Sequence, residues 1–225
     1  MAEAELLIVI FAKPAVPGRV KTRLLPSLTA EQAAQFHLAA LADTVAAAKS
    51  VAGDWLELHI AGDADDALEF RARYPGCTVR QQCGEDLGAR LIYSFAGSFA
   101  RGVERTLILG SDHPTLPPQY LVEALEHLRF ADLVFGPSRD GGYYAAGVRR
   151  DGWPGAQAAF EGIPWSTSAV LETSLDRARR AGLKVALTPE WYDVDRPQDL
   201  EALGRDAQPQ SASLRLLDEI GRKRA

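Results

Sequence analysis

Short apolar runs recur along the chain, and amphipathic stretches separate them. The first run, residues 6–12, contains no polar side chain. A strand that is buried on both faces has this pattern, as in a parallel sheet. Further runs predict strands at 55–61, 77–81, 107–109, 132–136, 144–148 and 184–187.

The stretches between these runs have the spacing of amphipathic helices. Thr29 and Gln32 match a capping box, and one helical stripe follows them: Ala34, Leu38, Leu41, Val45 and Ala48. Another stripe after 84–88 comprises Leu87, Leu91, Phe95 and Phe99. Further helices are predicted at 117–129, after 165, opening within 193–200, and at 212–223.

Strands alternate with helices through the first 130 residues. This alternation predicts right-handed βαβ units and an α/β fold, with a mostly parallel sheet covered on both faces. No break in composition marks a boundary, so we expect one domain over residues 1–204. A polar linker and a C-terminal helix are expected over 205–225.

A carboxylate follows the strand at 107–109 almost at once. Gly110 ends the apolar run, Asp112 follows two residues later, and Pro114 stops the strand. Open α/β sheets bind ligands at the carboxyl ends of their strands. Asp112 therefore has two interpretations: it caps the following helix, or it binds Mg²⁺ (or Mn²⁺) together with phosphate oxygens and water.

The loop after the first strand, residues 13–26, is rich in cations. It carries Lys13, Arg19, Lys21 and Arg23, with Gly18 among them. Such side chains are usually solvated, but their clustering before a helix start favours phosphate binding. The Walker pattern of a P-loop is absent.

A second metal ligand has to come from elsewhere in the chain, and the segment 193–195 offers Asp193 and Asp195. The alternative for Asp195 is a capping pair with Gln198. His113 lacks a second histidine at ligand spacing, so a His/Asp metal pair is disfavoured. Ser111 lacks the elbow motif of a nucleophilic serine.

Two further segments carry polar groups that suit an acceptor. One comprises Asp140, Gly141, Gly142 and Tyr143. Its glycines let backbone approach a ligand closely, or merely supply positive φ angles. The other comprises Trp165, Ser166 and Thr167, whose hydroxyls cap the next helix or contact an acceptor.

Charge and cysteine content narrow the class of protein. A net charge of −5 argues against general nucleic-acid binding. Two cysteines, Cys77 and Cys83, do not make a disulfide framework, and we interpret both thiols as small buried groups of a reduced, cytoplasmic protein. No apolar run approaches the roughly 18 residues of a membrane span. The sequence does not fix the oligomeric state, and a homodimer is one possibility.

Six ordered motifs resemble one known family, the bacterial GT-A-fold, glycosyltransferase-like proteins related to 2-phospholactate guanylyltransferase and, more distantly, to molybdenum-cofactor guanylyltransferase. The motifs are Phe11-Ala-Lys-Pro-x-x-Pro-Gly-x-Val-Lys-Thr-Arg-Leu24, Gly84-x-Asp-Leu-Gly-x-Arg-Leu91, Gly110-Ser-Asp-x-Pro114, Gly136-Pro-x-x-Asp-Gly-Gly-Tyr143, Phe160-x-Gly-Ile-Pro-Trp-Ser-Thr167 and Asp193-Val-Asp-x-Pro-x-Asp-Leu200.

The resemblance implies a nucleotide-diphospho-sugar transferase fold, which is a Rossmann-like three-layer α/β/α sandwich. It also implies that Asp195 shares a metal ion with Asp112. Two residues depart from the family pattern. Arg196 replaces a threonine, which moves the helix cap, and His113 replaces a small residue.

These residues are compatible with three functions. The first is nucleotidyl transfer from an NTP to a small phosphorylated or acidic acceptor, with release of pyrophosphate. It is favoured because Pro114 removes the Asp-x-Asp signature of many GT-A glycosyltransferases. The second is glycosyl transfer from a nucleotide sugar, with Asp140 as the acceptor base. The third is nucleotide binding without turnover.

The expected site residues form four sets. The catalytic set is Lys13, Lys21, Arg23 and Asp112. The metal set is Asp112 and Asp195. The nucleotide-binding set is Ala12, Lys13, Gly18, Lys21, Arg23, Gly84, Asp86 and Arg90. The acceptor set is Asp140, Gly141, Gly142, Tyr143, Trp165, Ser166 and Thr167.

Overall fold

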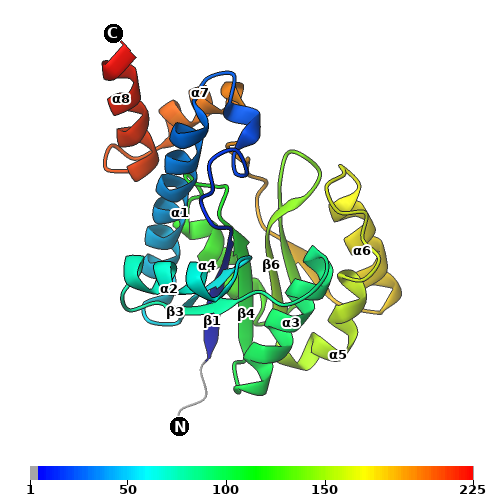
Figure 1. Ribbon diagram of the computed structural model, residues 1–225. Helices are drawn as coiled ribbons and strands as arrows, with labels where there is room; N and C mark the ends of the chain where they lie inside the picture. Colours follow the sequence, from blue (N-terminus) through cyan, green and yellow to red (C-terminus); the bar gives the residue numbers. More distant parts are fainter. Residues whose placement is uncertain (1–4, 225) are drawn as a thin grey trace.

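A computed structural model describes residues 5–224 of the chain, and within them one seven-stranded sheet forms the centre of the fold (Figure 1). The strands are β1 (Leu6–Ala12), β2 (Leu56–Ile60), β3 (Thr78–Gln81), β4 (Arg105–Gly110), β5 (Leu133–Pro137), β6 (Tyr143–Arg149) and β7 (Val185–Leu187). Their order is β3-β2-β1-β4-β6-β5-β7. Only β6 is antiparallel to its neighbours, so the prediction of a mostly parallel sheet is confirmed.

Helices cover both faces of the sheet, as the strand alternation requires. Ile8 and Ile10 of β1 face a core made with α1 (Ala30–Ala52), α2 (Ala64–Arg73) and α4 (Pro118–His127). Leu7 and Val9 face the opposite core, made with α3 (Leu87–Ala100), α5 (Trp153–Ala156) and α6 (Val170–Arg180). The predicted three-layer sandwich is therefore present, and its buried strands explain the runs of apolar residues.

The C-terminal helices α7 (Pro197–Asp206) and α8 (Ala212–Arg224) form a third apolar cluster with the start of α1. Asp43 of α1 accepts hydrogen bonds from the backbone amides of Ala212 and Ser213, at 2.6 and 2.9 Å. The terminal helix predicted at 212–223 is thus present and lies along α1 (Figure 1). This third cluster includes Leu24 of the 13–26 loop and Val194 of the segment before α7, so it packs these two segments together.

Several local predictions need correction. α2 was not predicted, because it buries only Ala67 and Phe70 and leaves Leu68 62% exposed. The α3 stripe begins one turn later than expected, since Leu87 is 41% exposed. The thiols are not both buried: Cys83 is exposed and Cys77 is half-buried. The predicted capping box of Thr29 and Gln32 is confirmed.

No helix within residues 5–224 combines the length and the apolar character that a membrane span requires.

Gly88 and Gly97, both in α3, should respond in opposite directions to alanine. A Cβ atom on Gly88 would lie 2.1 Å from the carbonyl oxygen of Phe160, whereas one on Gly97 would meet nothing closer than 3.7 Å. Gly88→Ala is therefore expected to lower the free energy of unfolding by about 1–3 kcal/mol. Gly97→Ala is expected to raise it by roughly 0.5–1 kcal/mol. Urea unfolding measures both, and a Gly88→Ala variant as stable as wild type would contradict this close approach.

Candidate functional site

Three side chains from distant segments meet at the carboxyl end of β4. Asp112 follows that strand, Lys21 comes from the loop after β1, and Asp195 comes from the segment before α7. The backbone amide of Val194 donates to the carbonyl of Asp112 at 3.0 Å. This bond holds the 193–195 segment beside the end of β4, where an α/β sheet binds ligands.

Lys21 joins the two carboxylates. Its ammonium nitrogen Nζ lies 2.5 Å from Asp112 Oδ1 and 2.9 Å from Asp195 Oδ1, and it donates to the Val194 carbonyl at 2.8 Å. The Lys21 side chain is only 2% exposed. Its backbone is left-handed, with φ of 48° and ψ of 36°, which few residues other than glycine adopt. Such strain concentrates at functional sites, and here it turns the lysine inward.

The cluster changes the acid–base behaviour of its members. Burial alone would lower the pKa of Lys21, but the Asp112 and Asp195 carboxylates outweigh it and hold this pKa above its usual range. Burial alone would raise the pKa of Asp112, but the adjacent Lys21 ammonium holds it well below its usual range. Lys21 and Asp112 are therefore both charged at neutral pH.

Neither aspartate has the capping role that was the alternative in the sequence. α4 begins after Pro117 with no side-chain cap, so Asp112 caps nothing there. The N-cap of α7 is Arg196, and Asp199 accepts from the backbone amides of Asp195 and Arg196 at 3.0 and 2.7 Å. The cap has thus moved away from Asp195, whose Oδ2 lies 3.7 Å from the Arg23 guanidinium.

His113 belongs to a second polar cluster rather than to Asp112. Its Nδ1 lies 3.1 Å from Asp193 Oδ1 and 3.2 Å from the Tyr192 carbonyl, and Ser138 Oγ donates to the same Asp193 oxygen at 2.7 Å. Burial raises the pKa of Asp193. These bonds occupy Asp193, which leaves Asp195 as the carboxylate directed at Lys21.

The predicted nucleotide residues divide between a cavity and its surroundings. A cavity of about 400 Å³ is lined by Lys13, Pro14, Val16, Arg19, Val20, Ala61, Gly62, Asp66 and Arg90. Arg90 Nε donates to the Gly84 carbonyl at 3.1 Å, which brings the 84–90 motif to this cavity. Asp86 is the N-cap of α3 and accepts from Ala89 at 2.7 Å. Gly18 stands in the loop with φ of 76°.

The predicted acceptor residues form a separate group in which two motifs pack together. Gly141 has φ of 88°, and a Cβ atom there would lie 2.2 Å from the Ser168 carbonyl. Tyr143 stacks edge-on against Trp165, with centroids 6.2 Å apart. Asp140 accepts from the Gly142 amide at 2.9 Å, and Thr167 Oγ1 accepts from the Ala169 amide at 3.3 Å. These polar groups stabilise their own turns.

Ser166, the last of the predicted acceptor residues, is exposed, with φ of 66°. Ala12, predicted for the nucleotide, is buried at the end of β1, and its carbonyl accepts from Gln82 Nε2 at 3.4 Å. Neither side chain lines the 400 Å³ cavity.

Three residues of the site were not predicted from the sequence. Asp66 lines the cavity, and its local signal is only the capping box with Asp63. Gln82 holds the ends of two strands through the Ala12 and His59 carbonyls, at 3.4 and 2.8 Å. His37 of α1 donates to the Lys13 carbonyl at 3.0 Å and fixes the loop. Each depends on a contact between distant segments.

The two carboxylates have the oxygen ligands that a hard divalent cation prefers, but two carboxylates alone do not complete the coordination of such an ion. Across residues 5–224 no group of three or more His, Cys, Asp or Glu side chains is placed to hold a metal. The side chains of Asp112 and Asp195 remain 44% and 35% exposed, and the second oxygen of each is not paired with Lys21. Mg²⁺ accepts one or two carboxylates when substrate phosphates and water complete its shell.

Comparison with known proteins identifies a matching protein family and a solved structure that is similar over nearly the whole chain. The family profile described as "Uncharacterized protein conserved in bacteria (DUF2064)" matches residues 41–167. A crystal structure from Desulfovibrio desulfuricans G20, of a protein provisionally assigned as a nucleotide-diphospho-sugar transferase, is 33% identical with a TM-score of 0.87. That match covers 97% of this chain and 96% of the other.

More distant structures share the fold. A cytidylyltransferase from Leptospira borgpetersenii serovar Hardjo-bovis is 12% identical with a TM-score of 0.58, covering 98% of this chain and 95% of the other. CMP:2-keto-3-deoxy-manno-octonic acid synthetase complexed with CTP is 16% identical with a TM-score of 0.54, covering 89% and 97%. No curated protein gives a significant sequence match.

Proposed function

Because this chain belongs to the bacterial family DUF2064, and because its site joins a cationic loop to two carboxylates, we propose that it is a nucleotide-using transferase. The favoured reaction is nucleotidyl transfer: an oxygen of a small phosphorylated or acidic acceptor attacks the α-phosphorus of an NTP. A new P–O bond forms, the bond to the β-phosphate oxygen breaks, and pyrophosphate leaves.

The observation that carries this proposal is the position of Lys21 between Asp112 and Asp195, at 2.5 and 2.9 Å. The cluster lies at the carboxyl end of the central strand β4, next to the cavity that Lys13, Arg19 and Arg90 line. Nucleotidyl transfer depends mainly on positioning and on electrostatic stabilisation, so it needs cations and carboxylates here but no protein nucleophile.

Each group then has a distinct task. Lys13 and Arg19 contact the triphosphate, and Arg23, whose guanidinium lies 3.7 Å from Asp195 Oδ2, adds positive charge beside the reaction centre. Lys21 is a positioning residue, because its ammonium holds Oδ1 of Asp112 and Oδ1 of Asp195 and leaves the second oxygen of each carboxylate for other partners. A Mg²⁺ ion bound to those oxygens would supply further charge neutralisation for the leaving pyrophosphate.

Glycosyl transfer is the second candidate, and the structural relative provisionally assigned as a nucleotide-diphospho-sugar transferase favours it. In that reaction Asp140 would act as the base for the acceptor hydroxyl. Its carboxylate is exposed but bonded to the Gly142 amide at 2.9 Å. The Asn variant at this position keeps an acceptor for that bond, so it tests the charge alone.

The products separate the two reactions. The protein is incubated with Mg²⁺ and each NTP or nucleotide sugar over a panel of small acceptors. Nucleotidyl transfer predicts pyrophosphate from the NTP reactions, and the product carries the nucleoside monophosphate. Free nucleoside diphosphate without pyrophosphate would instead establish glycosyl transfer. If no nucleotide shifts the melting temperature, with or without Mg²⁺, neither transferase activity is tenable.

A further inference from the structure

A second cavity is lined by the other half of the loop that contributes to the 400 Å³ cavity, which is called the nucleotide cavity below because the proposed function places the nucleotide there. It measures about 530 Å³ and is lined by Thr22, Arg23, Pro26, Arg196, Pro197 and Gln198. Residues 13–20 of the loop line the nucleotide cavity, whereas residues 22–26 line this one. Lys21 stands between these two segments in the sequence, with a left-handed backbone and a side chain that is only 2% exposed.

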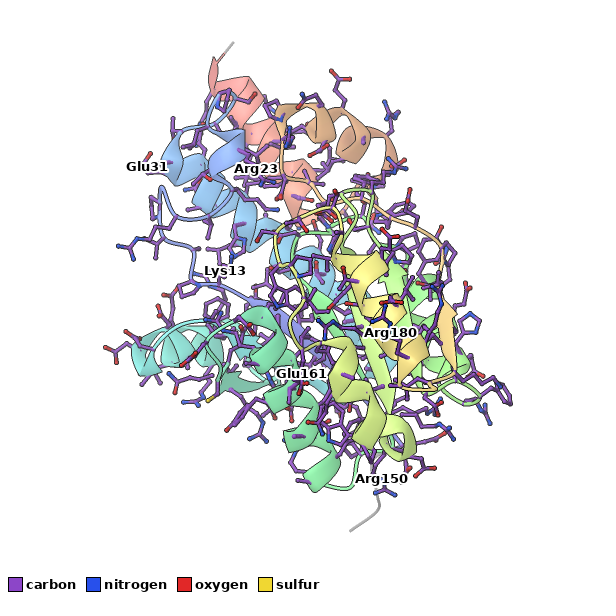
Figure 2. All side chains as sticks on the ribbon, turned by 90° about the vertical axis from the view of Figure 1, so that its right-hand side faces the viewer. Lys13, Arg23, Glu31, Arg150, Glu161 and Arg180 are labelled. Carbon is purple, nitrogen blue, oxygen red and sulfur yellow. The ribbon has the colours of Figure 1, made fainter. Side chains whose placement is uncertain are left out.

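Residues of the same loop line both cavities, but the other lining residues come from different parts of the fold. Lys13 lies toward α2 and α3, whereas Arg23 lies toward the C-terminal helices (Figure 2). Arg23 also approaches the reaction centre, since its guanidinium lies 3.7 Å from Asp195 Oδ2. A molecule in the second cavity would therefore adjoin Asp195 without passing through the nucleotide cavity.

The charges that line the second cavity are all positive. Arg23 and Arg196 are its two ionised residues, and Thr22 and Gln198 add neutral polar side chains. Arg23 is 65% exposed, and within residues 5–224 it forms one ion pair, at 3.7 Å with Asp195, whose other oxygen lies 2.9 Å from Lys21. Guanidinium groups bind carboxylate and phosphate oxygens through two parallel hydrogen bonds.

We propose that the cavity between the 22–26 turn and the start of α7 binds the acceptor, and that the acceptor carries a phosphate or carboxylate group held by Arg196 and Arg23. This inference rests on the proposed function, since it assigns the second substrate of that reaction. It also gives Arg196 a role in acceptor specificity, and it places the acceptor beside Asp195 rather than beside Asp140.

Arg196→Gln tests the proposal, and Arg205→Gln is its matched control. Arg196 is the N-cap of α7, and Arg205 is exposed in the last turn of that helix, nine residues further along, at roughly 13 Å by the helical rise. Isothermal titration measures inorganic phosphate and each NTP binding to the whole protein. Arg196→Gln is expected to weaken phosphate binding about tenfold, while NTP affinity stays within about twofold and Arg205→Gln changes neither.

Lys13→Met provides the complementary arm, because Lys13 lines the nucleotide cavity and is absent from the lining of the second cavity. It should weaken NTP binding and leave phosphate binding unchanged. If Arg196→Gln weakens NTP but not NMP binding, the cavity holds the terminal phosphates of the donor, and the proposal is wrong. Equal phosphate affinity in wild type and Arg196→Gln, or no phosphate binding to wild type at millimolar concentration, also overturns it.

The phosphate titration needs neither turnover nor nucleotide. If the product assay shows no nucleotidyl transfer, the result of the phosphate titration therefore still stands. Conversely, an Arg196→Gln variant with unchanged phosphate affinity would remove the acceptor site without affecting evidence for pyrophosphate release.

Discussion

Replacing Asp112 by asparagine is expected to lower kcat/KM for the NTP about 100- to 1,000-fold. The substitution keeps the shape of the side chain but removes its charge, together with the ion pair of 2.5 Å to Lys21. It also removes one of the two carboxylates available to a divalent cation, so Mn²⁺-dependent nucleotide binding should weaken. Steady-state kinetics and titration of the Mn²⁺ signal by electron paramagnetic resonance measure the two effects.

Asp140→Asn is the control for that experiment. Asp140 accepts a hydrogen bond from the Gly142 amide in its own turn, at 2.9 Å, and asparagine can accept the same bond. For nucleotidyl transfer its kcat/KM should stay within about threefold of wild type. An inactive Asp140→Asn variant beside an active Asp112→Asn variant would refute the role of Asp112 and support Asp140 as a glycosyl-transfer base.

Replacing Lys21 by methionine is expected to lower both activity and stability. The variant leaves the Asp112 and Asp195 carboxylates facing each other without the ammonium that lies 2.5 and 2.9 Å from them. We expect kcat/KM to fall about 100-fold and the free energy of unfolding at pH 7 to fall by roughly 1–3 kcal/mol. For a domain of this size 1 kcal/mol corresponds to about 2–4 °C in Tm.

The pH dependence identifies the cause of that instability. In wild type the lowered pKa of Asp112 gives stability that is complete above its unfolded pKa of about 3.9. That stability is lost as the pH falls through the folded value. The raised pKa of Lys21 gives stability that is complete below its unfolded pKa of about 10.4 and lost as the pH rises through the folded value. The contribution of the pair is therefore constant from about pH 5 to 10.

Lys21→Met should behave differently over this range. Without the ammonium, repulsion between the carboxylates favours protonation of one of them, so the Tm deficit should shrink between pH 7 and pH 5. Lys13→Met is the control, since Lys13 is exposed in the same loop and its loss should shift Tm by less than about 2 °C. A deficit of equal size at both pH values would show that lost packing, rather than charge, causes the instability.

The sequence predicted those parts of the fold whose signals are local. β1 was predicted at its observed bounds, Leu6–Ala12, because a strand buried on both faces is apolar throughout. The Thr29 capping box is also a local signal, because Thr29 and its partner Gln32 are only three residues apart. α2 escaped prediction because only Ala67 and Phe70 of its side chains are buried.

Contacts between distant segments could not be predicted from spacing. Lys21 was expected to face phosphate, and only the fold brings it within 2.9 Å of Asp195, 174 residues away. Cys83 was interpreted as buried because of its chemistry, but it lies in an exposed loop after β3. Asp195 was left with a capping alternative, which is wrong because the backbone amides of Asp195 and Arg196 donate to Asp199 at the start of α7.

A crystal structure of the protein with Mn²⁺ and a non-hydrolysable NTP analogue tests the central claim most directly. The account predicts an anomalous Mn²⁺ peak at about 2.0–2.2 Å from carboxylate oxygens of both Asp112 and Asp195. It also predicts the triphosphate against Lys13 and Arg19. A nucleotide bound away from this loop, or a peak that contacts neither carboxylate, would contradict the account.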